Sequence, residues 1–69
     1  MTNETKQKIR DLIQRGRDLH TAAMDCKATS EDLDENFHEI AEKYRLAAQH
    51  FADGAKLCSD AVSRLIKND

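Results

Sequence analysis

A seven-residue repeat of apolar residues in the C-terminal half constrains the fold of this 69-residue chain more than any other feature. Two further apolar rows run beside it, one from Leu33 to Ala61 and one from Ala41 to Val62. Three rows in phase form a single apolar stripe on a long helix, and such a stripe requires other helices to pack against. The residues of the first row are Phe37, Tyr44, Phe51, Cys58 and Leu65.

The composition predicts a single all-α domain over residues 1–69. Proline is absent, glycine occurs only twice, and 35% of the residues are charged. Such a composition, together with a heptad repeat, is typical of long packed helices. The large apolar residues are too few for a self-sufficient core, so the sequence favours association with a second chain.

Net charge and hydropathy narrow the expected location and partners. The net charge of −2 provides no global field toward nucleic acids or acidic membranes. Apolar stretches are short and interrupted, so we expect no signal peptide, no membrane span and a cytoplasmic location. In the cytosol Cys26 and Cys58 would be reduced, and their spacing matches no metal-binding or redox motif.

A first helix is predicted over about residues 3–27. Thr2 or Asn3 can cap it, and Glu4 suits the positive end of its dipole. Its apolar stripe runs from Ile9 to Cys26 and then fades.

A second helix is predicted over about residues 30–67. Thr29 and Asp32 have the spacing of a capping box, and acidic residues follow in the next turn. The connection is then very short, which predicts an antiparallel hairpin with a long second helix.

The expected difference in helix length leaves the residues after Gly54 beyond the end of the first helix. Two arrangements would cover their apolar side chains. Two hairpins can dimerise into a four-helix-type bundle, or the chain can bend at Gly54 and form a three-helix bundle. The dimer is favoured because the stripe crosses Gly54 without a change of phase.

Residues with catalytic or metal-binding chemistry do not form a convergent set in the sequence. The pair Glu35-x-x-His38 occurs once, whereas carboxylate-bridged helical bundles need two copies. Cys26 and Cys58 lie on the apolar stripes, where a cysteine acts as a small buried hydrophobe. The sequence therefore predicts no catalytic residue, no cofactor, no metal site and no enzyme.

One short motif nevertheless resembles a known signature. The segment Ser30-Glu-Asp-Leu-Asp34 is similar to the S-x-E-L-D signature of the small Spo0E-type aspartyl-phosphate phosphatases, with Asp32 in place of the glutamate. The resemblance implies a helical hairpin in which Ser30 and Asp34 mark the catalytic turn. Capping of a helix produces the same residue types for structural reasons.

The chain also resembles the plasmid-encoded Rop-type hairpins in its length and heptads. That resemblance implies a dimeric four-helix bundle that binds paired RNA loops. Acidic Asp11 and Asp18 interrupt the basic residues on which such binding would depend, so nucleic acid is not the favoured partner. The basic residues are Lys6, Lys8, Arg10, Arg15 and Arg17.

The favoured interpretation is a small helical protein-interaction module of bacterial or phage type, a coiled-coil homodimer that acts as a regulator, adaptor or inhibitor. The alternatives are an RNA-binding helical dimer and an aspartyl-phosphate phosphatase. Candidates for a partner-facing patch lie off the stripe, at Leu46, Leu57 and Ile66. The residues expected at the dimer interface are Phe37, Tyr44, Phe51, Cys58, Val62 and Leu65.

Overall fold

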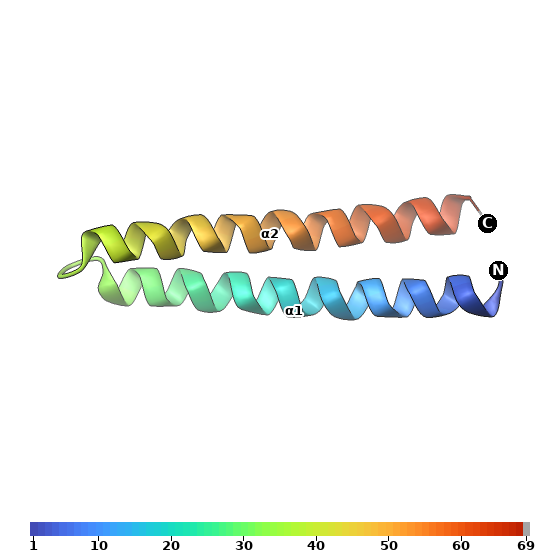
Figure 1. Cartoon of the computed structure of the whole chain (residues 1–69), viewed down its shortest axis with the longest axis horizontal. Helices are drawn as coiled ribbons and strands as arrows, with labels where there is room; N and C mark the ends of the chain where they lie inside the picture. Colours follow the sequence, from blue (N-terminus) through green and yellow to red (C-terminus); the bar gives the residue numbers. More distant parts are fainter. Residues whose placement is uncertain (69) are drawn as a thin grey trace.

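Two long helices form an antiparallel hairpin in the computed structural model, which describes residues 1–68 (Figure 1). Helix α1 spans Asn3–Leu33 and helix α2 spans His38–Lys67. The hairpin is a rod of 52 × 14 × 10 Å, with the N-terminus and the end of α2 side by side. The prediction of an all-α helical hairpin is confirmed. Within the described residues, neither helix is long and apolar enough to cross a membrane.

The start of α1 follows the sequence prediction. Thr2 is the N-cap, and its hydroxyl oxygen accepts a hydrogen bond from the backbone N–H of Thr5 at 3.1 Å. Glu4 lies in the first turn, where the helix dipole favours a negative charge. Helix α2 is also matched to its dipole, with Glu39 in its first turn and Arg64 in its last.

The predicted boundary between the helices, near residues 27–30, is wrong. Helix α1 continues to Leu33, and the turn occupies residues 34–37. Thr29 and Ser30 do not cap α2, because their hydroxyls donate to the carbonyls of Asp25 at 2.9 Å and Lys27 at 2.7 Å inside α1. Such back-bonding satisfies a hydroxyl within a helix and allows the helix to continue.

The predicted length of the second helix is also wrong, whereas its predicted continuity through Gly54 is confirmed. Helix α1 has 31 residues and α2 has 30, so no part of α2 extends beyond its partner. Helix α2 passes through Gly54 without interruption, as the unbroken phase of its apolar stripe indicated. The three-helix alternative is therefore excluded for this chain.

Small residues let the two helices approach closely. A Cβ atom at Gly16 would lie 3.4 Å from the Cβ of Cys58 and 3.8 Å from the carbonyl oxygen of Ala55. A Cβ at Gly54 would lie 3.2 Å from a methyl group of Leu19. Each glycine therefore faces the opposite helix at close range.

This close packing produces only a small core. Among residues 1–68 the buried hydrophobic side chains are those of Ala23, Ala41 and Cys58, joined by the hydroxyl of Ser30. Ser30 keeps the heptad spacing of Gly16 and Ala23, so it belongs to the line of small residues along which α1 packs against α2, which we call the seam. Most of the larger apolar side chains are only partly covered or are exposed.

The seam predicts opposite effects for two substitutions of Gly16. Gly16→Ala should raise the free energy of unfolding by up to about 1 kcal/mol, because its Cβ fits at 3.4 Å and alanine has the higher helix propensity. Gly16→Leu should lower it by about 1–3 kcal/mol, because the larger side chain forces the helices apart. Urea denaturation measures both. The matched control is Ala28→Leu at an exposed position of α1, and an equal loss there would contradict the seam.

Candidate protein-binding surfaces

A long groove runs between the helices on one face of the rod. Its first section, with a volume of about 570 Å³, lies near the middle of α1 and is lined there by Ile13, Arg17 and His20. Its second section, of about 620 Å³, continues from His20 toward the turn. Since His20 lines both sections, they form one surface, which we call the groove.

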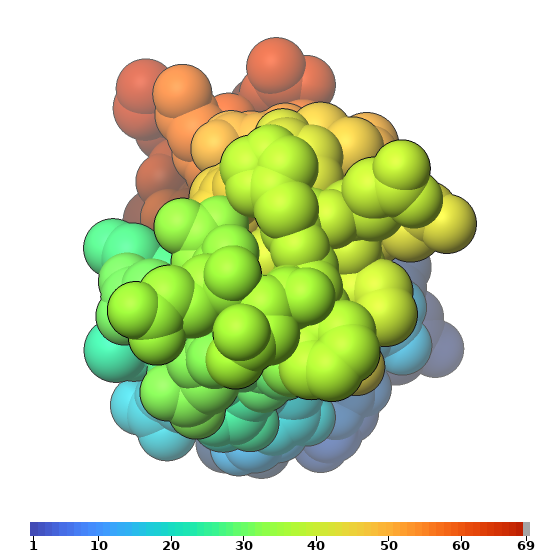
Figure 2. All heavy atoms as spheres, turned by 90° about the vertical axis from the view of Figure 1, so that its left-hand side faces the viewer, coloured from blue at the N-terminus to red at the C-terminus, as the bar shows by residue number. Residues whose placement is uncertain are grey.

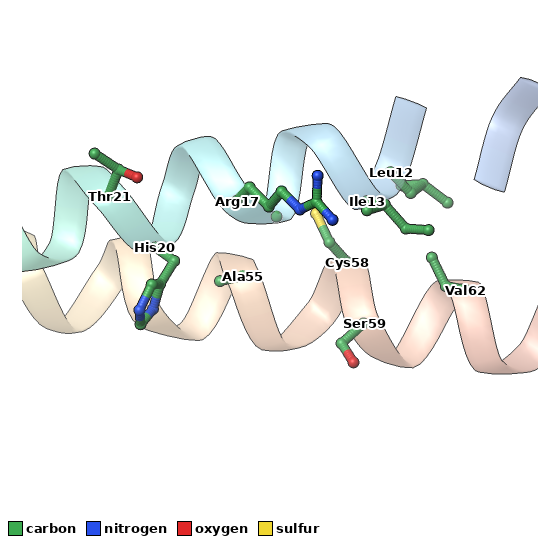
Figure 3. A pocket seen from close by; sticks show the side chains of 10 residues that line it. Leu12, Ile13, Arg17, His20, Thr21, Ala55, Cys58, Ser59 and Val62 are labelled. Atoms are coloured by element: carbon green, nitrogen blue, oxygen red, sulfur yellow. The ribbon is translucent and has the colours of Figure 1, made fainter. Parts of the chain in front are cut away.

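The floor of the groove is made of small residues from both helices. Helix α1 contributes Gly16, Ala23 and Ser30, which fall seven residues apart. Figure 3 shows Ile13 and Val62 at one end of the first section and His20 toward the other. A floor without bulky side chains leaves room for an apolar surface of a partner. The small residues from α2 are Ala48, Ala52, Ala55, Cys58 and Ser59.

Positive charges outnumber negative ones along the groove. Arg17 and Lys27 come from α1 and Arg45 comes from α2, whereas Glu31 is the one carboxylate among the lining residues. Arg17 and Lys27 form no ion pair with a carboxylate in residues 1–68. The groove therefore has a basic rim, although the chain as a whole carries a net charge of −2.

A second apolar surface lies at the turn end of α2. Phe37, the N-cap residue of α2, exposes 54% of its surface, and Ile40 and Tyr44, four residues apart on one side of the helix, expose 48% and 38%. We call these three residues the aromatic cluster. Figure 2 looks directly at this end of the rod, whose surface is formed by the turn and the start of α2.

The other predicted interface residues are less available to a second chain. Cys58 is buried against α1 beside Gly16, so it belongs to the seam of the hairpin itself. Phe51 and Leu65 are half-buried, and Val62 lines the groove. Sequence periodicity identified the row but could not separate residues that pack within the hairpin from those left exposed.

The three residues predicted as a partner patch do not form one patch. Leu46, Leu57 and Ile66 are all exposed, at 56%, 68% and 54%. Leu46 and Leu57 lie on nearly the same line along α2, whereas Ile66 is rotated by about 160° from Leu46 at 100° per residue. Ile66 instead continues the groove side of α2, since it lies four residues beyond Val62.

A charged cluster joins the turn to α2. Asp34 accepts a hydrogen bond from Arg45 at 3.2 Å, and the His38 Nδ1 lies 3.4 Å from the same carboxylate oxygen. Arg45 also pairs with Glu42 at 2.8 Å. The hydrogen bond from Arg45, and then its charge, lower the pKa of Asp34, and the two carboxylates raise the pKa of Arg45.

The two key residues of the phosphatase-like motif lie in different surroundings. Ser30 is 1% exposed inside α1, with its hydroxyl bonded to Lys27, whereas Asp34 is exposed in the turn. Ser30 is therefore part of the helix packing and does not stand on an exposed catalytic turn. Within residues 1–68, no group of three or more His, Cys, Asp or Glu side chains could hold a metal ion.

The basic residues near the start of α1 lie on different sides of the helix. Positions two apart are rotated by about 160° relative to each other at 100° per residue. Lys8 and Arg15 therefore point away from Lys6, Arg10 and Arg17. Only Arg17 of these five lines the groove, so the sequence segment does not produce one basic patch.

Comparisons with family models, with curated proteins and with solved structures find no significant match to this chain.

The groove is the feature that the sequence analysis missed. Met24 signalled it, because Met24 is a large apolar residue one position beyond Ala23 of the α1 stripe and is exposed, as is Ile13 of the stripe itself. Small residues on α2 gave a second signal, since Ala48, Ala52 and Ala55 fall four and three apart. Ala48 and Ala55 were assigned only to the apolar stripe and Ala52 to no surface, whereas all three line the groove.

The charged cluster predicts a pH-dependent contribution to stability. The folded-state pKa of Asp34 is lower than its ordinary value of 3.8, so its contribution is present above pH 3.8 and is lost as the pH falls through the lower folded value. Asp34→Asn should therefore lower the urea midpoint at pH 7. Its difference from wild type should disappear in acid.

The control for this measurement is Asp32→Asn. Asp32 is exposed in the last turn of α1 and pairs with no cation among residues 1–68. Its negative charge lies at the negative end of the helix dipole, which is unfavourable. Asp32→Asn should leave the midpoint unchanged or raise it slightly. A loss equal to that of Asp34→Asn would contradict the role of Arg45.

Proposed function

We propose that this chain is a small helical module that binds another protein and acts as a cytoplasmic regulator, adaptor or inhibitor, in the form of a homodimer. The observation that carries this proposal is the amount of apolar surface left outside the hairpin. The core of residues 1–68 contains three hydrophobic residues, of which two are alanines, whereas nine large hydrophobic residues are more than a third exposed.

The total surface of the chain supports the same conclusion. Its accessible surface is 5547 Å², whereas a compact monomer of 7.8 kDa exposes about 4,400 Å². The radius of gyration is 15.7 Å, compared with about 11 Å for a compact domain of this length. The excess of roughly 1,200 Å² is more than the ~800 Å² that each partner buries in a standard interface.

The aromatic cluster supports the proposal of a homodimer. Ile40 and Tyr44 lie on one side of α2, Phe37 precedes its first residue, and all three are exposed. A twofold contact uses the same patch on both subunits, and a patch of large uncharged side chains can cover its own copy without opposing charges. No other described segment brings two exposed aromatic residues so close in sequence.

Light scattering over a concentration series tests the homodimer. The wild-type chain should have twice its monomer mass of 7.8 kDa. Ile40→Glu should reduce the mass to that of the monomer, because it places a charge within the aromatic cluster. Leu46→Glu is the matched control, since Leu46 is similarly exposed on another side of α2, and it should leave the dimer intact.

Two results would contradict the homodimer. One is a wild-type chain that stays monomeric at every concentration while circular dichroism shows it to be helical. The other is an equal loss of mass in Ile40→Glu and Leu46→Glu, which would show that the contact is not centred on the aromatic cluster.

RNA binding, the first alternative from the sequence, receives no specific support. The basic residues of the α1 segment are divided between opposite sides of the helix. Phe37 and Tyr44 are at the turn end of the rod, and the stacking group nearest to that segment is His20, three residues after Arg17.

A further inference from the structure

We propose that the groove binds an amphipathic helix with an apolar seam and acidic flanks, supplied by the partner protein. This inference deepens the proposed function, since it names the surface and the chemistry of the partner. It rests on the shape of the groove, on its floor of small residues and on the sign of the charges that line it.

The shape of the groove suits a helix. It lies between two antiparallel helices. Its two sections together extend from Val62 and Ile13 to Arg45 and Glu31. A third helix placed along this line would contact both α1 and α2 and complete a three-helix arrangement. An extended strand would find no exposed sheet edge to pair with, because residues 1–68 contain no strand.

The floor of the groove allows close approach. Ala48, Ala52 and Ala55 on α2 face Gly16 and Ala23 on α1 across the groove, and none of them fills it. Leucine or methionine side chains from a partner could therefore enter between the helices. Larger apolar residues at the margin would enclose them, and these are Ile13, Met24 and Val62.

The charges select an acidic partner. The charged and titratable residues that line the groove are Arg17, His20, Lys27 and Glu31 from α1 and Arg45 from α2. Arg45 is engaged by Asp34 and Glu42, whereas Arg17 and Lys27 have no carboxylate partner in the described residues. Acidic side chains at the flanks of an incoming helix would supply these partners.

A second copy of this chain fits the groove less well. A twofold contact through this face would place the basic rim of one subunit against the basic rim of the other, and like charges disfavour that arrangement. The acidic residues of α1 are on its outer side, away from the groove. They form a row at heptad spacing that consists of Glu4, Asp11, Asp18, Asp25 and Asp32.

Fluorescence anisotropy with two synthetic peptides tests the proposal. Both peptides have the same helical seam of leucine and alanine, and they differ only in flanking glutamates or flanking lysines. The full chain should bind the glutamate peptide and not the lysine peptide. Binding should weaken as salt is raised, because the flanking contacts are exposed charge pairs.

A variant and its control locate the binding surface. Ala52→Glu places a carboxylate in the groove at an exposed position, and it should weaken binding of the glutamate peptide by about tenfold or more. Ala28→Glu makes the same change at an exposed position of α1 outside the groove and should keep wild-type affinity. Both variants should keep the helical circular dichroism of the wild type.

Four results would overturn the proposal. The first is equal binding of the two peptides, the second is no binding of either, and the third is an equal loss of affinity in the two variants. The fourth is that the glutamate peptide does not bind, whereas an oligouridylate RNA binds and Ala52→Glu abolishes its binding. A change of solution mass in Ala52→Glu alone would assign the groove to a second copy instead. Because the homodimer is tested separately at Ile40, failure of the groove and failure of the dimer are distinguishable.

Discussion

The close approach of the two helices through small residues is the constraint on which the rest of this structure depends. Gly16 faces Cys58 and the backbone at Ala55, and Gly54 faces Leu19, so the helices meet where side chains are smallest. Contacts of this kind are dense but cover little apolar area, because alanine and glycine have little to bury. The hairpin is therefore held in one register while most of its larger apolar side chains remain outside the seam.

This packing leaves two exposed surfaces of different chemistry. On one of them the small residues form the floor of a groove with a basic rim. On the other, at the turn end of α2, the aromatic cluster is exposed. The two surfaces differ in chemistry, since one combines cations with small apolar residues and the other is aromatic and aliphatic. A homodimer through the aromatic cluster would leave the groove open, so self-association and partner binding do not compete for the same residues.

Periodicity in the sequence predicted the helices better than local signals did. The heptad row of α2 correctly indicated a continuous helix through Gly54, although glycine has a low helix propensity. The acids after Ser30 were misleading, because they favour a helix start, whereas the structure places Glu31 and Asp32 in the last turn of α1. The spacing of Ser30, seven residues after Ala23 and fourteen after Gly16, indicated that α1 continues through it. This indication was missed because serine is polar and was not counted in the apolar stripe. The sequence contained the small residues that line the groove, but their spacing alone could not show the groove, because it depends on which sides of the two helices meet.

The nearly equal lengths of α1 and α2 affect the order in which their contacts can form. The turn lies at residues 34–37, so the contacts nearest to it join positions only a few residues apart, whereas contacts at the open end join residues near the two termini. Closing a loop becomes more costly in entropy as the loop lengthens, but each contact already formed shortens the loop that remains to be closed. The hairpin can therefore assemble as a zipper from its turn, and its local stability should decrease toward the open end, where Asn3 and Lys67 are located.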